Sequence, residues 1–268
     1  MEFGSDILLC ETSDKVARVT MNRPGARNSL SMAMLERLHS AIYALGADDN
    51  IHAIVIAGNG PAFCAGHDLK ELTAARAFDD GGQVFFEKTM NACSLLMQAI
   101  VTCPKPVIAQ VHGIATAAGC QLVASCDLAV AASDTRFATP GVNIGLFCST
   151  PMVALSRNVS RKRAMEMLLT GDLISAGQAA EFGLLNKIVE PAVLAAEVNA
   201  LAQKIASKSP VTLRIGKEAF YKQAEMTLQD AYGYASQVMV ANMMKPDAAE
   251  GISAFIEKRP PHWRALGG

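Results

Sequence analysis

The chain has 268 residues, of which 51% are hydrophobic and 18% are charged. This length is enough for one large domain or two small ones with a buried core. The formal net charge of −1 and the aromatic content of 6% argue against a basic, base-stacking surface. We therefore expect no nucleic-acid partner.

The seven cysteines show neither a CxxC spacing nor a Cys/His spacing typical of a metal site, so no metal ligands are predicted. Most lie among small or apolar residues, as reduced core cysteines do. No apolar run reaches the roughly 18 residues that a membrane span needs, and no secretory signal is visible. We expect no membrane partner and a cytoplasmic location, or the mitochondrial matrix in a eukaryote.

The first half of the chain alternates between strand-like and helical segments. A turn cluster, Asn22-Arg-Pro-Gly25, follows the second strand, and Ser31 suits the N-cap of the first helix. Residues 63–69 form a loop that leaves a buried strand. This order predicts α/β layering with a largely parallel sheet. Strands are expected at residues 7–10, 16–21, 52–57, 107–111 and 128–132, and helices at residues 31–45, 83–101 and 115–125.

From Thr150 onward the pattern is helical almost throughout, with Ser160 and Ser175 opening two of the helices. We expect one domain over residues 1–268, with a core of residues 1–200 and a C-terminal helical subregion of residues 201–268. The later helices are expected at residues 192–207, 212–221, 228–244 and 247–257.

Two segments of small residues leave buried strands: Cys64-Ala-Gly-His67 and Ala115-Thr-Ala-Ala-Gly119. Backbone N–H groups in such loops can converge on a carbonyl oxygen and stabilise the negative charge that develops on it. A helix N-terminus adds a favourable dipole. Each segment alone is equally compatible with a tight packing turn between a strand and a helix. A dinucleotide fold is disfavoured because GxGxxG is absent.

Taken together, the two segments resemble the enoyl-CoA hydratase/isomerase (crotonase) superfamily. The resemblance implies a crotonase-like (ClpP/crotonase) α/β spiral of strand-strand-helix units with a C-terminal helical trimerisation region. It implies acyl-CoA as substrate or ligand, no cofactor, and a homotrimer or a hexamer built as a dimer of trimers. Further matches in the same order are Asn22–Leu30, Lys105–Gly145, Ile174–Leu185 and Phe255–Pro260.

The resemblance also assigns site residues. The two oxyanion N–H groups fall on His67 and Ala118, the latter in place of a family glycine. Lys258 is expected near the CoA phosphates, in some relatives from a neighbouring subunit. The implied CoA pocket comprises Arg27, Ala65, Asp68, Leu69, Lys70 and Lys258.

Two positions depart from the family pattern. Gln121 and Gly141 stand where the hydratases carry their two catalytic glutamates. An amide can orient water but cannot exchange a proton near neutral pH, and glycine has no side chain. A positioned acid or base contributes on the order of 10²–10⁴ in rate, so efficient hydration is not expected. The assignment of an isomerase activity that needs a carboxylate near residue 141 is weakened for the same reason.

Other side chains could replace the missing glutamates, but each of them also has a structural interpretation. The His67 side chain is either catalytic or a solvent-exposed loop residue. A helix N-terminus could lower the pKa of the Cys148 thiol, whereas Ser149 or Thr150 could simply cap that helix. Asp127 is interpreted as a residue that braces a loop, and His112 as a turn histidine. Asp68 is also interpreted as a loop brace, in addition to its assignment to the CoA pocket.

Three hypotheses follow. The first is a lyase- or isomerase-type acyl-CoA enzyme that stabilises a thioester enolate, with ordinary hydratase activity doubtful. The second is an acyl-CoA-binding protein with little or no turnover. The third is an acyl-CoA thioester hydrolase that uses Cys148 or a water held by Gln121.

Overall fold

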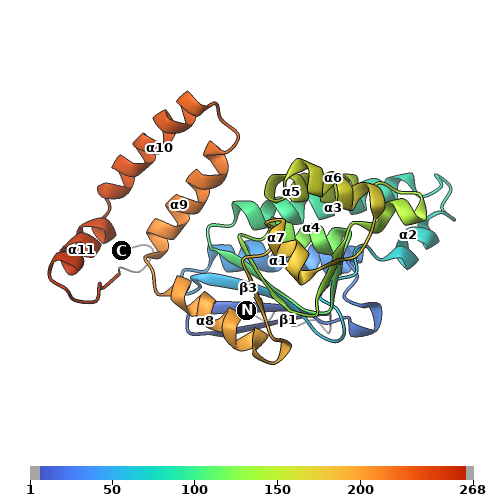
Figure 1. The fold of residues 1–268 in the computed structure, drawn as a ribbon, viewed down its shortest axis with the longest axis horizontal. Helices are drawn as coiled ribbons and strands as arrows, with labels where there is room; N and C mark the ends of the chain where they lie inside the picture. Colours follow the sequence, from blue (N-terminus) through green and yellow to red (C-terminus); the bar gives the residue numbers. More distant parts are fainter. Residues whose placement is uncertain (1–6, 264–268) are drawn as a thin grey trace.

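The computed structural model describes residues 7–263 of the chain. Two β-sheets covered by helices form the core, and a group of helices projects from the core at one end (Figure 1). Within the described residues, no helix is long and apolar enough to cross a lipid bilayer.

The larger sheet has six strands. The first strand pairs antiparallel with the second, and every later neighbouring pair is parallel. Parallel pairs require long crossover connections, which here carry the helices. In sheet order the strands are β1 (Leu8–Ser13), β2 (Val16–Met21), β3 (Ala53–Gly58), β4 (Val107–Val111), β6 (Leu128–Ala132) and β9 (Lys187–Val189).

The smaller sheet contains β5 (Ile114–Thr116), β7 (Arg136–Ala138) and β8 (Ile174–Ser175). Strands β5 and β7 are parallel, and β8 is antiparallel to β7. Two isolated parallel bridges, Cys64↔Ala115 and Leu30↔His67, continue this pairing on the other side of β5. Loop segments that are far apart in the sequence therefore run side by side.

The strands of the larger sheet bury both faces, because side chains alternate sides along a strand. Ile54 and Ile56 belong to the larger core cluster, together with residues of helices α1 (Met32–Ala47), α3 (Gln83–Thr102) and α4 (Ala118–Ser125). Val55 faces the opposite side and packs with helix α8 (Leu194–Ala206), which spans residue 200. The remaining core helices are α2 (Leu69–Ala75), α5 (Ser149–Asn158), α6 (Arg161–Thr170), α7 (Ala176–Glu181), η1 (Pro24–Ala26), η2 (Pro140–Ile144) and η3 (Pro191–Val193).

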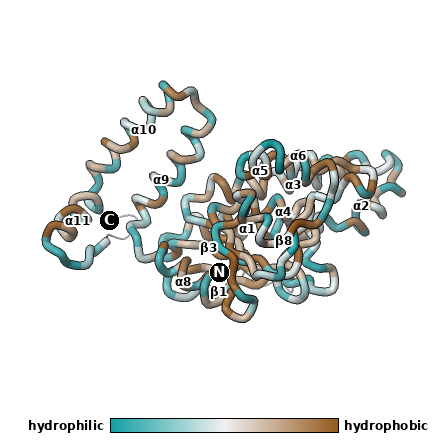
Figure 2. The backbone as a smooth tube through the Cα atoms, in the orientation of Figure 1, coloured by the Kyte–Doolittle hydropathy of each residue, from teal (hydrophilic) through white to brown (hydrophobic). Residues whose placement is uncertain are grey.

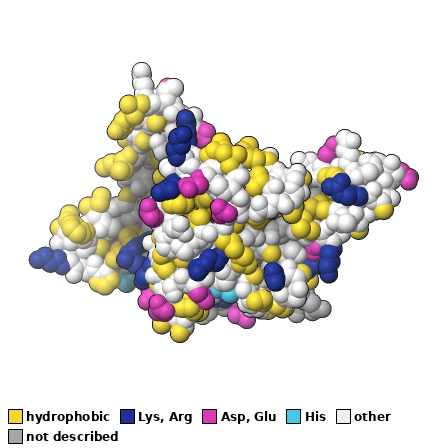
Figure 3. Space-filling view, turned by 45° about the vertical axis from the view of Figure 1, so that its right-hand side comes forward, with side chains coloured by type: hydrophobic (Ala, Val, Ile, Leu, Met, Phe, Trp, Pro, Cys, Tyr) yellow, Lys and Arg dark blue, Asp and Glu magenta, His cyan; other side chains and the backbone are white. Residues whose placement is uncertain are grey.

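Three helices project from the core and are called the arm here: α9 (Pro210–Gln223), α10 (Leu228–Met243) and α11 (Pro246–Ile256). Helix α10 buries no residue, and Figures 2 and 3 show hydrophobic residues gathered along the arm. Its exposed large apolar side chains are Phe220, Leu228, Tyr232, Met239, Val240, Met243, Met244, Ile252, Phe255 and Ile256.

A buried ion pair attaches the arm to the core. Lys217 on α9 donates to an Asp127 carboxylate oxygen at 2.6 Å and to the carbonyl oxygens of Ile100 and Lys105. The Tyr221 hydroxyl and the Val107 N–H also donate to Asp127. The interpretation of Asp127 as a structural brace is confirmed.

Several predicted elements are confirmed and others are wrong. Strands over residues 16–21, 107–111 and 128–132 match the prediction, and Ser31 caps α1 by accepting from the Met34 N–H. The helix predicted over residues 115–125 starts only at Ala118, because residues 114–116 form β5. Strands β7, β8 and β9 were not predicted. With two or three residues each, they are too short to show alternation.

Candidate active site

Four chain segments end together at one edge of the smaller sheet. Leu30 donates to the Gly66 carbonyl at 2.7 Å and accepts from the Asp68 N–H at 3.2 Å. Cys64 pairs in the same parallel manner with residues 114 and 116, and β5 pairs with β7. The residues that follow these segments, from 65–68, 117–119 and 139–141, therefore meet at a common site.

Two backbone N–H groups at this site are free of backbone partners. The Leu30 bonds go to the residues on either side of His67, so the His67 N–H is left without a backbone acceptor in the described chain. Ala118 is the first residue of α4, where an N–H has no acceptor within the helix. A Cβ placed on Gly66 would lie 3.5 Å from the Ala118 nitrogen, so the two segments are in contact. The structure thus brings the two predicted oxyanion amides together.

The turn that presents the Ala118 N–H is strained. Ala117 has φ 50° and ψ −119°, a conformation that costs a non-glycine residue about 1–3 kcal/mol. It is held by a hydrogen bond from its N–H to the Ala138 carbonyl at 2.9 Å. At Gly119, a Cβ would lie 2.1 Å from the Cys64 carbonyl oxygen, so this close approach requires glycine. The residue for which alanine is unfavourable is Ala117, whereas Ala118 is helical.

Gln121 lies one turn into α4 and is 5% exposed. Its side-chain oxygen is 3.8 Å from the Cys93 sulfur on α3, which acts as the donor. Burial raises the pKa of the Cys93 thiol to about 12, so this neighbour is neutral near pH 7. Neither member of the pair exchanges protons readily near neutral pH.

A cysteine thiol lies beside Gly141, the second position that departs from the family pattern. The Gly141 N–H donates to the Cys148 sulfur at 3.3 Å. A Cβ on Gly141 would lie 2.7 Å from the Leu146 carbonyl oxygen and 2.9 Å from that sulfur. The loop over residues 141–148 therefore occupies the space that a glutamate side chain would need.

The prediction of a lowered pKa for Cys148 is wrong. Burial raises the pKa of this thiol, and the hydrogen bond from Gly141 only partly offsets that effect. Cys148 is itself the residue before α5, and no side chain caps this helix. The Ser149 hydroxyl donates to the Phe147 carbonyl instead, so the expected capping by Ser149 or Thr150 is also wrong.

The His67 ring is not the exposed loop side chain that was the alternative interpretation. Both ring nitrogens are buried and lack a hydrogen-bond partner. Burial lowers the pKa of the imidazole, so the ring is neutral near pH 7. Next to Gly141, the Thr139 hydroxyl is likewise buried without a partner. Sequence reasoning missed Thr139, because nothing in the pattern distinguishes it from a packing residue.

Five of the predicted CoA-pocket residues lie in contiguous structure. The Ala65 N–H donates to the Arg27 carbonyl at 3.0 Å, and the Arg27 side chain is exposed. Leu69 and Lys70 begin α2 and are exposed, and Asp68 caps this helix by accepting from the Lys70 N–H. The interpretation of Asp68 as a loop brace is confirmed.

Asp68 is held by Arg23 and Ser29, two residues to which sequence reasoning gave no role. Arg23 forms an ion pair with Asp68 at 2.9 Å, and the Ser29 hydroxyl donates at 3.1 Å. Burial by itself raises the pKa of Asp68, but the hydrogen bonds from Arg23, the Lys70 N–H and Ser29 outweigh it and lower that pKa. The turn cluster at residues 22–25 was the sequence signal that could have pointed to a structural role for Arg23.

Lys258 is separated from these residues. It follows α11, at the opposite end of the molecule from α2 (Figure 1). Within one chain it does not join Arg27 and Lys70. The His112 Nε2–H donates to the Gly60 carbonyl at 2.8 Å, which confirms His112 as a turn histidine.

Comparisons with known proteins agree with this arrangement. A family model described as enoyl-CoA hydratase/isomerase matches residues 11–265. The chain belongs to this family. The mouse enoyl-CoA hydratase domain-containing protein 3, mitochondrial, is 49% identical over 250 residues, which cover 93% of this chain and 82% of the mouse protein. The human protein of the same name is also 49% identical, with 93% and 81% covered.

Solved structures of family members have the same fold. An enoyl-CoA hydratase from Mycobacterium smegmatis superimposes with a TM-score of 0.92 at 51% identity, covering 97% of this chain and 99% of that one. The human enoyl-CoA hydratase domain-containing protein 3 gives 0.91 at 47% identity, covering 96% and 100%. The fold of this enoyl-CoA hydratase/isomerase family member is therefore crotonase-like, as the resemblance implied.

Proposed function

We propose that this family member binds an acyl-CoA thioester and stabilises its enolate oxygen with the N–H groups of His67 and Ala118. The observation that carries this proposal is the proximity of two backbone N–H groups that have no backbone acceptor among the described residues. Fixed donors aimed at a developing oxyanion are among the largest contributions to catalysis. The strained Ala117 turn, braced by Ala138, supports the same role because it fixes the direction of one donor.

Ordinary hydration is not part of the proposal. Hydration needs a base for water and an acid for the α-carbon. Gln121 supplies neither, and the loop that carries Leu146 and Cys148 fills the space beside Gly141. The Cys93 thiol stays protonated near pH 7, and the lowered pKa of His67 makes its imidazole a weaker base than an ordinary histidine.

The CoA moiety is proposed to bind along Arg27, Ala65, Asp68, Leu69 and Lys70. Arg27 and Lys70 are exposed cations suited to phosphate groups. Asp68 is proposed to contribute by holding the loop in place, since its carboxylate is already engaged by Arg23 and Ser29. No metal or redox cofactor is proposed.

A second copy of the chain is proposed to cover the arm. Phe255 is 85% exposed and Met244 is 81% exposed, and apolar side chains of this size rarely gather on the surface of a monomer. We propose a homotrimer or a dimer of trimers. In such an assembly Lys258 would reach the CoA phosphates of a neighbouring subunit.

The proposal is tested by proton exchange. Enolate formation passes an α-proton of butyryl-CoA to solvent water, and return of a deuteron from D₂O labels the α-carbon, which mass spectrometry detects without any hydration. Ala118→Pro removes the N–H donor, and proline is tolerated at the first position of a helix. We expect exchange in the parent protein and at least a hundredfold loss in the variant. Ala118→Gly keeps the N–H and is the matched control.

A second candidate function is acyl-CoA binding without turnover. The raised pKa values of the Cys93 thiol beside Gln121 and of the Cys148 thiol beside Gly141 favour it. Stoichiometric acyl-CoA binding with no α-exchange, no hydration and no CoA release would support it. A thioester hydrolase using Cys148 is weakened by the raised pKa of that thiol, so release of CoA would point to a water held by Gln121. Failure to bind any acyl-CoA would refute all three.

The names of two relatives support a proposed location. The mouse and human proteins carry the word mitochondrial in their names. We propose the mitochondrial matrix for this chain if its source is a eukaryote, and the cytoplasm if it is a bacterium.

A further inference from the structure

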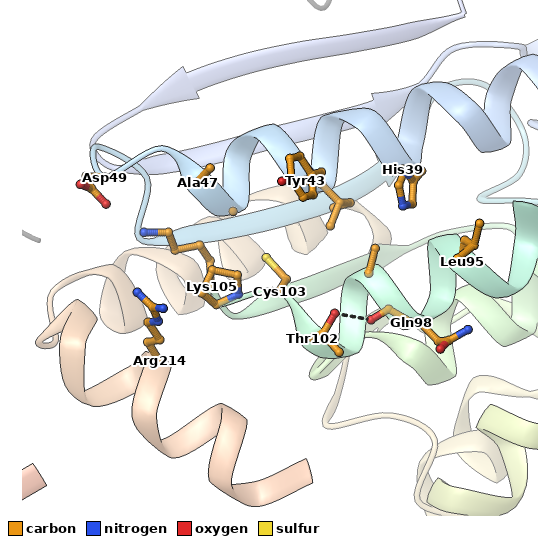
Figure 4. Close-up of a pocket in the computed structure, with 14 residues that line it drawn as sticks. His39, Tyr43, Ala47, Asp49, Leu95, Gln98, Thr102, Cys103, Lys105 and Arg214 are labelled. Atoms are coloured by element: carbon orange, nitrogen blue, oxygen red, sulfur yellow. Dashed lines mark hydrogen bonds between the residues drawn. The ribbon is translucent and has the colours of Figure 1, made fainter. Parts of the chain in front are cut away.

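A cleft of about 530 Å³ lies between α1 and α3, apart from the candidate active site (Figure 4). Residues 49 and 105, which line it, precede strands β3 and β4. The oxyanion segments instead follow the carboxyl ends of parallel strands. The cleft is therefore at the opposite edge of the fold. One face of each helix lines it, with His39, Tyr43 and Ala47 on α1 and Leu95, Gln98 and Thr102 on α3.

Lys105 enters this cleft as a buried cation. The residue is only 4% exposed, and its ammonium forms no ion pair or hydrogen bond within the described part of the chain. Figure 4 shows its side chain extending toward the side on which Asp49 and Arg214 lie, away from Tyr43 and Leu95. Burying an unpaired ammonium group costs several kcal/mol, so such groups normally have a partner.

Two carbonyl groups near the end of α3 accept from donors other than Lys105. The carbonyl of Ile100, in the last turn of α3, accepts from Lys217, and the Gln98 carbonyl accepts from the Thr102 hydroxyl. Asp49 lines the cleft but forms no ion pair with Lys105 among the described residues. The Lys105 ammonium therefore has no hydrogen-bonded partner among the described residues, although Asp49 and Asp48 attract it from beyond ion-pair distance.

A second cation, Arg214 on α9, lines the same end of the cleft without an ion pair among the described residues. Burial is the main effect that lowers the pKa of Lys105; Asp49, Cys103 and Asp48 oppose it, and the nearby Arg214 adds to it. Lys105 and Arg214 therefore repel each other, and an anion placed between them would relieve that repulsion. Asp49 and Asp48 already offset part of this charge, which favours a ligand with one negative charge over a phosphate.

Beyond the two cations, apolar side chains line the cleft together with the polar His39, Gln98 and Thr102. Tyr43 is 75% exposed and Leu95 is 56% exposed at its far end, and Ile42 and Ala99 line it between the helices. We propose that this cleft binds a fatty-acid-type carboxylate, with its head group between Lys105 and Arg214 and its hydrocarbon tail along the groove between α1 and α3. The site does not depend on the chemistry proposed at His67 and Ala118.

The test is isothermal titration of the full chain with octanoate, and with 1-octanol and acetate as probes of tail and head. We expect one octanoate per chain, with weaker binding of both other probes. Lys105→Met keeps the side-chain length and removes the charge. We expect it to weaken octanoate binding at least tenfold, about 1.4 kcal/mol, and to leave 1-octanol binding unchanged.

Two further measurements distinguish a ligand-binding role of Lys105 from a structural one. Without ligand, Lys105→Met should unfold at the same or a higher temperature, because it removes a buried unpaired charge. The exposed Lys204→Met is the matched control and should bind octanoate as the parent does. Absence of octanoate binding, unchanged binding in Lys105→Met, or acetate binding as tight as octanoate would overturn the proposal. A lower subunit number in Lys105→Met would overturn it too, because Lys105 would then pair with another copy of the chain.

Discussion

The Cys148 sulfur occupies the position from which a side chain at residue 141 would extend. It accepts the Gly141 N–H at 3.3 Å and would lie 2.9 Å from a Cβ on that residue. The packing of the loop over residues 141–148 therefore leaves no room for a larger side chain at residue 141. This has a direct consequence for attempts to restore hydratase chemistry.

Restoring both glutamates should not create an efficient hydratase. Gln121→Glu combined with Gly141→Glu forces a side chain against the Leu146 carbonyl and Cys148, and we expect a loss of about 1–3 kcal/mol in unfolding free energy. Crotonyl-CoA hydration, followed by loss of the enoyl-thioester absorbance, should stay at least a hundredfold below ordinary enzyme rates. Gln121→Glu alone is the control for folding. Ordinary hydratase turnover by the double variant would contradict this expectation.

Relieving the strain at Ala117 should stabilise the protein. Glycine adopts positive φ without the steric cost that alanine has, so Ala117→Gly is expected to raise the unfolding free energy by about 1 kcal/mol. Urea denaturation measures the change. Ala118→Gly, one residue further on in helical conformation, should instead lose about 0.5–1 kcal/mol. Equal effects at the two positions would show that Ala117 is not strained.

Asp68 should make stability depend on acidic pH. Its folded-state pKa is lower than usual, so its contribution is fully present above the ordinary Asp pKa of about 3.9 and is lost as pH falls through the folded-state pKa. At pH 7, Asp68→Asn should cost about 2 kcal/mol of unfolding free energy, and this difference should shrink toward pH 3. Denaturant titrations across this range measure it.

The exposed Asp79→Asn is the matched control for that series. Its unfolding free energy should follow the parent protein at every pH. If Asp68→Asn also follows the parent, the bonds from Arg23 and Ser29 contribute nothing to stability.

Polar substitutions in the arm should separate the subunits. Phe255→Ser and Met244→Ser each remove an exposed apolar side chain of the arm, and together they are expected to lower the molar mass measured by light scattering from that of a trimer or hexamer to that of one chain. The unfolding of the core should change little, since neither side chain packs in it. Thr227→Val, at the cap of α10, alters the arm without touching these side chains and serves as the control. A parent protein that is already monomeric would refute the proposed assembly.

The pattern of the sequence was sufficient for the long elements. Strands such as Val16–Met21 and Val107–Val111 are continuous apolar runs, and Ser31 and Ser175 are side-chain caps that act within one turn. Local rules of this kind need no knowledge of the rest of the chain. The short strands β7 to β9 exist only because neighbouring segments supply their hydrogen-bond partners, so no local pattern announces them.

The candidate site divides in the same way. The sequence by itself determined the family, and it predicted the two oxyanion segments and the absence of both glutamates, because residue identity and spacing are read directly from the chain. Only the tertiary structure decided that the strain falls on Ala117, that Cys148 fills the space at Gly141 with a protonated thiol, and that Lys105 is buried without a partner among the described residues. Strain, available space and pKa depend on atoms contributed by distant segments, and those contacts form only when the sheets and helices pack together.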